Sequence, residues 1–168
     1  ELYAKMANSI YGLSSIALRF FNVYGERQDS MSRYSGVISV FIDQMLNKEE
    51  IIIYGGLQTR DFIYVGDAVR SIFNAINIVI DQNVCNQFNV LTGTSVSIDH
   101  LFNLLSNILD YALEPNYKEL TDGDPAKSDG TVKKLNDELS LDANSFTSLE
   151  DGLLKTIKSH PIADFEKI

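Results

Sequence analysis

The stretch IALRFFNVYG, residues 16–25, decides the class of fold. It is a short and nearly continuous apolar run, which is typical of a strand buried on both faces of a parallel sheet. A parallel strand needs neighbours joined to it by crossover connections, and only one helical segment, residues 1–11, precedes this run. We therefore expect an α/β fold in which this strand has further neighbours outside the chain.

Apolar spacing and local caps predict the remaining elements. Residues 1–11 carry apolar side chains at four-residue spacing, and Gly12 is placed to end that helix. Further helices are expected at 37–47, from Asp67 through Ile76, from Ser97 through Ile108, near 132–135, and from a capping box at residues 147–150 onward. Strands are expected at 51–54, 60–65, 87–90 and 116–119.

Composition narrows the class of function. The chain has 168 residues, enough for one domain or part of a larger one, and its formal net charge is −9. That charge disfavours a nucleic-acid partner, because such a protein needs Lys and Arg to replace phosphate counterions. No apolar run approaches the roughly 20 residues that span a bilayer. Cys85 has no second cysteine to pair with, which fits a reducing cytoplasm.

Two polar residues could contact a ligand. Asn22 ends a buried strand, where open α/β sheets place ligand contacts, although a hydrogen bond to a nearby turn explains it equally well. Arg60 follows a glycine-containing turn, and its fork of donors suits a diphosphate. A local network of Arg60 with the adjacent Asp61 is the simpler interpretation of the residues alone.

The chain resembles one enzyme family in several motifs that occur in the family's order. They are LRFFNVYG (18–25), YSGVI (34–38, then Ser39 where proline is usual), QTRDFIYV with DAV (58–69), and FNV followed by Gly93. These are similar to motifs of the extended short-chain dehydrogenase/reductases, in the UDP-glucose 4-epimerase-like group of NAD-dependent epimerases/dehydratases. Residues 123–124 and 149–153 resemble the end of the same pattern, so the resemblance covers nearly the whole chain.

The resemblance implies a fold and a division of the chain. Family members bind NAD in a Rossmann half and grip a nucleotide sugar in a smaller C-terminal half. We expect the C-terminal portion of such a Rossmann-type enzyme, with its small mixed α/β substrate domain. Residues 1–25 would end the Rossmann-type domain, and 26–168 would be mostly substrate-binding. Within the latter, residues 66–90 would return a helix and a strand to the Rossmann-type sheet.

The resemblance also assigns roles to residues near the cofactor and the sugar. Phe21 is expected near the nicotinamide of NAD, and Asn22 is expected to contact the sugar or the diphosphate. Val37 and Phe41 are expected to shape the substrate pocket. Core packing is the alternative interpretation of Phe41.

A second group of positions is implied for the nucleotide. Ile52 and Tyr54 are expected near the base, although Tyr54 would also suit ordinary core packing. Arg60 is expected to meet the diphosphate, and Asp124 is expected to face the ribose or the uracil. The ligand implied is a UDP-sugar or another nucleotide sugar.

The family's redox residues are absent from the chain. No glycine-rich G-x-x-G-x-x-G fingerprint occurs, and no Tyr has a Lys four residues later. The resemblance places the missing Tyr and Lys on the helix of residues 1–11, with the Lys about one turn before Glu1. We assign no catalytic residue, and we expect the chain alone to be inactive and to bind NAD poorly. The complete enzyme is expected to be a homodimer.

Two departures from the family pattern concern the phosphate grip. Thr121 and Ala126 stand where family members carry arginine, and Lys127 is the nearest cation. The turn at residues 55–58 is also one residue shorter than the usual G-D-G-x-Q. These departures imply weaker phosphate binding or a different ligand.

Other chemistries find little support. His100 and His160 lie outside any nucleophile or metal motif, so we expect structural roles for them. Asp122, Asp124 and Asp129 lack the glycine and the terminal glutamate of a calcium loop, and we expect no metal site.

Three functions remain to be separated. The first is half of a nucleotide-sugar 4-epimerase, with dehydratase or decarboxylase chemistry on the same scaffold as its close alternative. The second is a non-catalytic module that binds a nucleotide sugar or a protein. The third is a stand-alone α/β interaction domain whose likeness to the family is accidental.

Overall fold

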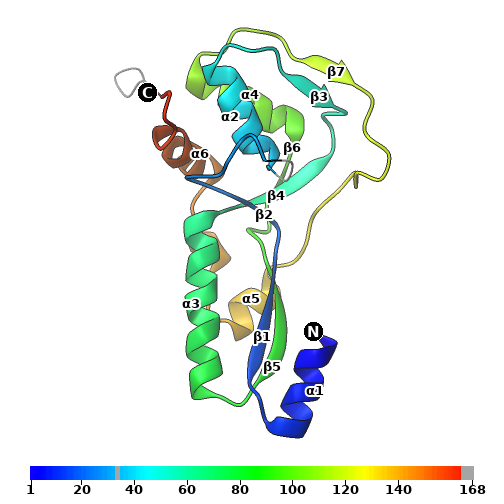
Figure 1. The fold of residues 1–168 in the computed structure, drawn as a ribbon, viewed down its shortest axis with the longest axis vertical. Coiled ribbons are helices and arrows are strands. Elements are labelled where there is room, and N and C mark those ends of the chain that lie inside the picture. Colours follow the sequence, from blue (N-terminus) through cyan, green and yellow to red (C-terminus); the bar gives the residue numbers. More distant parts are fainter. Residues whose placement is uncertain (33–34, 164–168) are drawn as a thin grey trace.

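The computed structural model describes residues 1–32 and 35–163. Its helices are α1 (Leu2–Tyr11), α2 (Val37–Leu46), α3 (Val65–Asp81), α4 (Ile98–Leu109), α5 (Lys133–Glu138), the 3-10 turn η1 (Ala143–Ser145) and α6 (Leu149–Lys158). Its strands are β1 (Ser15–Phe20), β2 (Asn22–Tyr24), β3 (Ile52–Tyr54), β4 (Thr59–Tyr64), β5 (Cys85–Val90), β6 (Ser95–Ser97) and β7 (Asn116–Lys118). Figure 1 shows an elongated molecule, with β1, β5, α1 and α3 toward one end and α2, α4, β3 and β7 toward the other.

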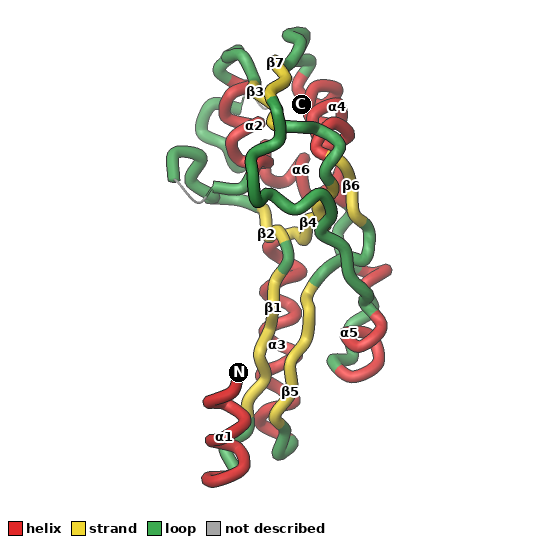
Figure 2. The backbone as a smooth tube through the Cα atoms, turned by 90° about the vertical axis from the view of Figure 1, so that its right-hand side faces the viewer, coloured by secondary structure: helices red, strands yellow, loops and turns green. Residues whose placement is uncertain are grey.

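One end is built on the parallel pair β1–β5, whose register runs from Ser15 beside Cys85 to Phe20 beside Val90. The two strands lie side by side in Figures 1 and 2 although some 70 residues separate them, and α3 contacts β1. This is the expected parallel, crossover-linked arrangement of an α/β fold. A cluster of buried side chains joins β5 to α5 and η1: Ile63, Ala75, Phe88, Val90, Leu135, Leu139, Leu141 and Ala143.

The expected burial of the first strand on both faces is wrong for this chain. No residue of β1 is fully buried, and Phe20 is 38% exposed. The reason is that β5 is the one strand paired with β1 among residues 1–32 and 35–163. Large exposed apolar side chains also occur on the neighbouring helices: Leu2, Tyr3, Met6, Ile10 and Tyr11 on α1, and Phe73, Ile76 and Ile80 on α3.

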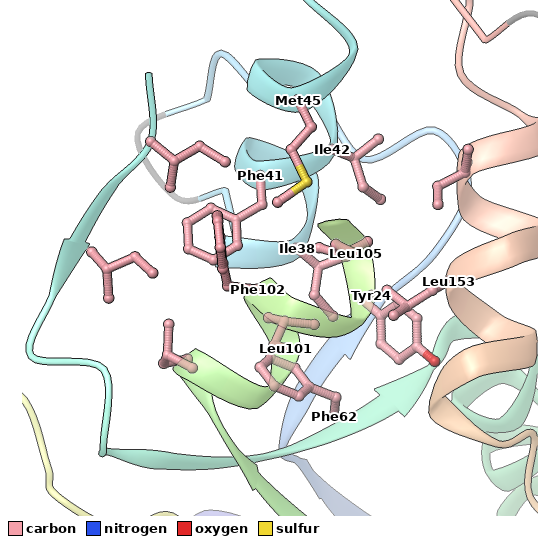
Figure 3. Close-up of a cluster of buried hydrophobic side chains, with 14 of the residues drawn as sticks. Tyr24, Ile38, Phe41, Ile42, Met45, Phe62, Leu101, Phe102, Leu105 and Leu153 are labelled. Atoms are coloured by element: carbon pink, nitrogen blue, oxygen red, sulfur yellow. The ribbon is translucent and has the colours of Figure 1, made fainter. Parts of the chain in front are cut away.

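The other end holds the sheet β2–β4–β6 and the parallel pair β3–β7. β2 runs parallel to β4, with Asn22 beside Phe62, whereas β6 runs antiparallel to β4. Side chains from α2, α4 and α6 meet in a second core, shown in Figure 3. In that core the rings of Phe41 and Phe102 meet edge to face, with centroids 6.2 Å apart.

The stretch that decides the fold is two strands rather than one. β1 ends at Phe20 and β2 begins at Asn22, and between them the Phe21 N–H donates to the Val90 carbonyl at 3.0 Å. The break arises because the chain changes partner here, from β5 to β4. The chain passes here from one end of the molecule to the other.

Helix caps are confirmed in two cases and wrong in two. Gly12 ends α1 in the left-handed conformation, and the Ser97 hydroxyl accepts from the His100 N–H at 3.1 Å. Asp67 does not cap α3, which begins at Val65; its carboxylate instead accepts the Thr147 N–H at 2.8 Å and a bond from Arg70.

The capping box also begins one residue later than expected. Ser148 is the N-cap of α6, and its hydroxyl accepts from the Asp151 N–H at 3.1 Å. The Thr147 N–H, which a capping box at 147–150 would pair with Glu150, donates instead to Asp67 at 2.8 Å.

α6 is held against the sheet by a close contact between Gly152 and Tyr24. A Cβ atom added at Gly152 would lie 2.0 Å from Tyr24 Oη, so only glycine fits. The Tyr24 hydroxyl donates to the Leu149 carbonyl at 3.3 Å, and its ring packs edge to face on Phe62. Burial, together with the nearby Asp67 carboxylate, raises the pKa of Tyr24.

We predict that Gly152→Ala lowers the free energy of unfolding by about 1–3 kcal/mol, because the new methyl group overpacks the Tyr24 ring. Alanine in a helix interior is ordinarily favoured over glycine by about 1 kcal/mol, so the sign of the change in urea denaturation is diagnostic. Tyr24→Phe is the matched partner variant, since it removes the nearest clashing atom. The double variant should be less destabilised than the sum of the single ones; strict additivity would contradict the contact.

Candidate functional site

A cavity of about 430 Å³ lies between β2, the segment leading into α2, α2 itself, β3, β4 and the segment after β7. It is mostly apolar on the α2 side and polar near β4. Every residue that the resemblance assigned to the substrate lines it: Asn22, Val37, Phe41, Ile52, Tyr54, Arg60 and Asp124. Distant parts of the chain are thus brought together at one concave surface, as ligand sites require.

The apolar wall of the cavity doubles as the surface of the core. Phe41 is 3% exposed and packs on Phe102, so the core interpretation of Phe41 is confirmed, and the residue also lines the cavity. Figure 3 shows Ile38 and Phe41 projecting from α2 into the same cluster. Ile52 and Tyr54 are 37% and 47% exposed, so the core interpretation of Tyr54 is wrong. The part of the cavity wall formed by β3 is therefore exposed.

Arg60 is the cationic group of the site, and its ion-pair partner is Asp124 rather than the adjacent Asp61. Its Nη1 also donates to the carbonyls of Thr59 and Pro125, at 2.8 Å each. The guanidinium is thereby fixed against the cavity wall, with its side chain 11% exposed. The expected Arg60–Asp61 network is wrong because the Asp61 carboxylate is engaged elsewhere.

Asp61 is the buried anchor of this region, and sequence reasoning missed it. The residue is fully buried, and its carboxylate accepts the Thr92 N–H, the Thr92 hydroxyl and the Gly93 N–H at 2.8–2.9 Å. The turn after β5 is thus tied to β4. The Asp61 carbonyl also accepts from Asn22 Nδ2 at 3.0 Å, so Asn22 both bonds a neighbouring strand and lines the cavity.

The shortened turn at residues 55–58 is stabilised by its own glutamine. Gly55 and Gly56 adopt positive φ angles of 79° and 108°, which glycine tolerates without strain. Gln58 is buried and spans the turn, accepting the Gly56 N–H and donating to the Tyr54 carbonyl, both at 2.6 Å. Gln58 lines the cavity, and its place in the QTRDF motif was the signal that could have identified it.

Thr121, which stands where family members carry an arginine, faces the cavity. Thr121 lines the cavity beside Asp124, so a neutral side chain stands there. The Ala126 carbonyl accepts the Thr59 N–H at 3.0 Å, which attaches this segment to β4. Arg60 is therefore the one arginine or lysine among the described residues lining the cavity.

One sequence-predicted site residue, Phe21, lies apart from the cavity. Phe21 does not line it; its ring lies near Gly130, where an added Cβ would approach Phe21 Cζ to 3.2 Å. Tyr34, in the YSGVI motif, falls outside the described residues. For NAD, Phe21 is thus the single expected contact in the chain, and the sequence offers no phosphate-binding glycine loop beside it.

The described residues were searched for metal-ligating clusters and for membrane-spanning helices. No group of three or more His, Cys, Asp or Glu side chains there is placed to hold a metal ion. Within the same ranges, no helix is both long and apolar enough to cross a bilayer. His160 lies 3.4 Å from an Asp43 carboxylate oxygen, which fits its expected structural role.

Comparison with known proteins identifies the family. The sequence profile of the NAD dependent epimerase/dehydratase family matches residues 1–90, more than half of the chain. The chain therefore belongs to this family, and its likeness to the family is not accidental.

Solved structures and curated sequences agree with this assignment. The crystal structure of a UDP-glucose 4-epimerase with UDP-glucose, from Thermotoga maritima, is 36% identical with a TM-score of 0.86, over 94% of this chain and 49% of that one. A UDP-N-acetylglucosamine 4-epimerase from Methanobrevibacter ruminantium, in complex with UDP-N-acetylmuramic acid, is 36% identical with a TM-score of 0.81, over 95% and 50%. A UDP-N-acetyl-alpha-D-glucosaminuronate decarboxylase of Bacillus cytotoxicus is 30% identical, over 89% and 47%. The chain spans about half the length of the curated relatives it matches.

We predict that Asp61→Asn lowers the free energy of unfolding by about 2–3 kcal/mol. The amide offers one acceptor oxygen to three donors, and its NH₂ group then faces a backbone N–H. Urea denaturation measures the loss, with the exposed Asp122→Asn as the matched control, expected within about 0.5 kcal/mol of the parent. Equal stability of the two variants would contradict the anchoring role of Asp61.

Proposed function

We propose that this chain is the nucleotide-sugar-binding half of an NAD-dependent sugar-nucleotide 4-epimerase and is incomplete for catalysis on its own. The observation that carries the proposal is the gathering of all seven expected substrate residues around one cavity. Similarity to UDP-sugar 4-epimerases over nearly the whole chain supports the same ligand class.

Arg60 is suited to a diphosphate by the donors that it has left. A guanidinium carries five N–H groups, and the bonds to Thr59, Pro125 and Asp124 use three of them. Its Nε–H and one Nη2–H remain for a ligand. Because Asp124 already holds the guanidinium in place, the side chain loses little conformational freedom on binding. Ile52 and Tyr54 supply an exposed apolar and aromatic surface for the base, and Asp124 an acceptor for ribose or uracil.

The sugar would then lie toward Asn22 and Val37, at the part of the cavity built by β2 and α2. The chemistry that NAD supplies when bound is the removal and return of a hydride at C4 of the sugar. Phe21, at the crossing between β1 and β2, is the residue of this chain proposed to lie near the nicotinamide. The family's tyrosine and lysine are not in the sequence, so the chain holds and orients the substrate without a proton-transfer group of its own.

Decarboxylase or dehydratase chemistry on the same scaffold is the second candidate, favoured by the 30% identical decarboxylase. The cavity described here would bind the nucleotide in either case. We also propose that the complete enzyme is a homodimer in the cytoplasm; exposed apolar residues of α1 support an interface, and the free thiol of Cys85 supports a reducing compartment.

Calorimetric titration of the 168-residue chain with UDP tests the binding role. We predict that Arg60→Ala weakens UDP binding by about 10- to 100-fold, because two charge-assisted hydrogen bonds are lost. Arg19→Ala is the control: that arginine pairs with Glu1 on the exposed surface away from the cavity, and UDP affinity should stay within about twofold. A parent chain that does not bind UDP would refute the proposal.

We further predict that the chain alone binds no stoichiometric NAD and has no epimerase activity. The physical reason is that the sequence lacks the glycine-rich loop for the pyrophosphate and the Tyr–Lys pair for proton transfer. Equilibrium dialysis with NAD and a UDP-glucose turnover assay check the two statements. One equivalent of bound NAD would show that the chain builds a cofactor site by other means.

A further inference from the structure

The substrate cavity carries opposite charges that cancel. Among the described residues that line it, Arg60 is the one cation and Asp124 is the one carboxylate, and the two form an ion pair. The other described lining side chains are apolar or neutral. A phosphate-bearing ligand is therefore not drawn to this lining by a net charge, and its phosphates must be recognised through direct hydrogen bonds.

The free donors of Arg60 limit how many phosphate groups it can hold. Its Nη1 donates to the carbonyls of Thr59 and Pro125 at 2.8 Å each, and its Nη2 donates to the Asp124 carboxylate. Two donors are left, the Nε–H and one Nη2–H. Two donors of a guanidinium match the two non-bridging oxygens of one phosphate group. Once Arg60 holds one phosphate in this way, it has no donor for the next.

Thr121 stands beside the ion pair, on the segment that follows β7. It lines the cavity, and its carbonyl accepts the Asp124 N–H at 3.1 Å. Its hydroxyl is a neutral donor, and hydrogen bonds between neutral groups are about half as strong as charge-assisted ones. The neighbouring Asp124 carboxylate also repels a second phosphate. A second phosphate that lies toward this segment therefore gains little binding energy from these side chains.

We propose that the cavity recognises one phosphate group of its ligand, and that Thr121 is the specificity-determining residue that leaves the next phosphate without a cationic partner. The proposal rests on the proposed function, because it takes Arg60 as the phosphate-binding residue. The substrate class that follows is sugars joined to a nucleoside through either one phosphate or two. A strong preference for the diphosphate would need a second cation, which the described lining does not hold.

Calorimetry with UMP and UDP on the 168-residue chain tests the proposal. We expect the dissociation constants of the parent for the two ligands to lie within about fivefold of each other, because the second phosphate meets no cation. Thr121→Arg supplies that cation, so it should tighten UDP binding by about tenfold and UMP binding by less than about threefold. Thr121→Gln, which is long but neutral, is the matched control and should keep the UMP-to-UDP ratio of the parent.

Different results separate this proposal from the proposed function. A parent that binds UDP but prefers it to UMP by more than about fivefold would refute single-phosphate recognition and leave the proposed function standing. An equal gain for both ligands in Thr121→Arg, or no gain, would refute the role of Thr121. A parent that binds neither ligand would refute both proposals. Thr121→Lys carries the same charge and serves if the arginine variant does not fold.

Two further cations provide the remaining controls. Lys118 does not line the cavity, although its Nζ lies 5.9 Å from the centroid of the Tyr54 ring, which does. Arg33 falls outside the described residues. Lys118→Ala and Arg33→Ala should each leave the UMP-to-UDP ratio within about twofold of the parent value. A loss of UDP affinity alone in either variant would identify a second phosphate-binding cation and overturn the proposal.

Discussion

The buried carboxylate of Asp61 is the constraint on which the site depends. It takes up three hydrogen bonds from Thr92 and Gly93, and the carbonyl of the same residue holds the Asn22 amide. A carboxylate buried without such donors would be strongly disfavoured, so the turn after β5 must stay against β4. β2, β4 and the β5–β6 turn are therefore locked together at the point where the two ends of the molecule meet.

The cavity follows from this lock and from the change of strand partner at Phe21. β1 pairs with β5 at one end, and β2 pairs with β4 at the other. The residues of β2, which follow this change of partner, line the cavity. Arg60 lies next to Asp61 on β4, and its pairing with Asp124 attaches the segment after β7 to the same strand. One strand thus positions the Arg60 guanidinium, the amide of Asn22 and the segment after β7 that lines the cavity. The apolar wall is the outer surface of the core around Phe41, which keeps it rigid.

Much of the secondary structure was predictable because its signals are local. Apolar spacing and glycine located α1, and Ser97 located the start of α4, since both depend only on neighbouring residues. The caps at Asp67 and residues 147–150 were misplaced for a common reason: the Asp67 carboxylate bonds the Thr147 N–H, 80 residues away. No pattern within either segment contains that pairing. The expected Arg60–Asp61 network failed in the same way, because each side chain has its partner in a distant turn.

The sequence by itself determined the family and singled out seven residues that line the cavity, because the motifs carrying most of them are short and continuous. Only the tertiary structure decided that these residues share one cavity and that Arg60 is held by Asp124 with donors to spare. Which donors of a side chain stay free depends on chain segments that meet only after folding. The split of residues 16–25 between β1 and β2 has the same origin, since a continuous apolar run cannot show where its hydrogen-bonding partner changes.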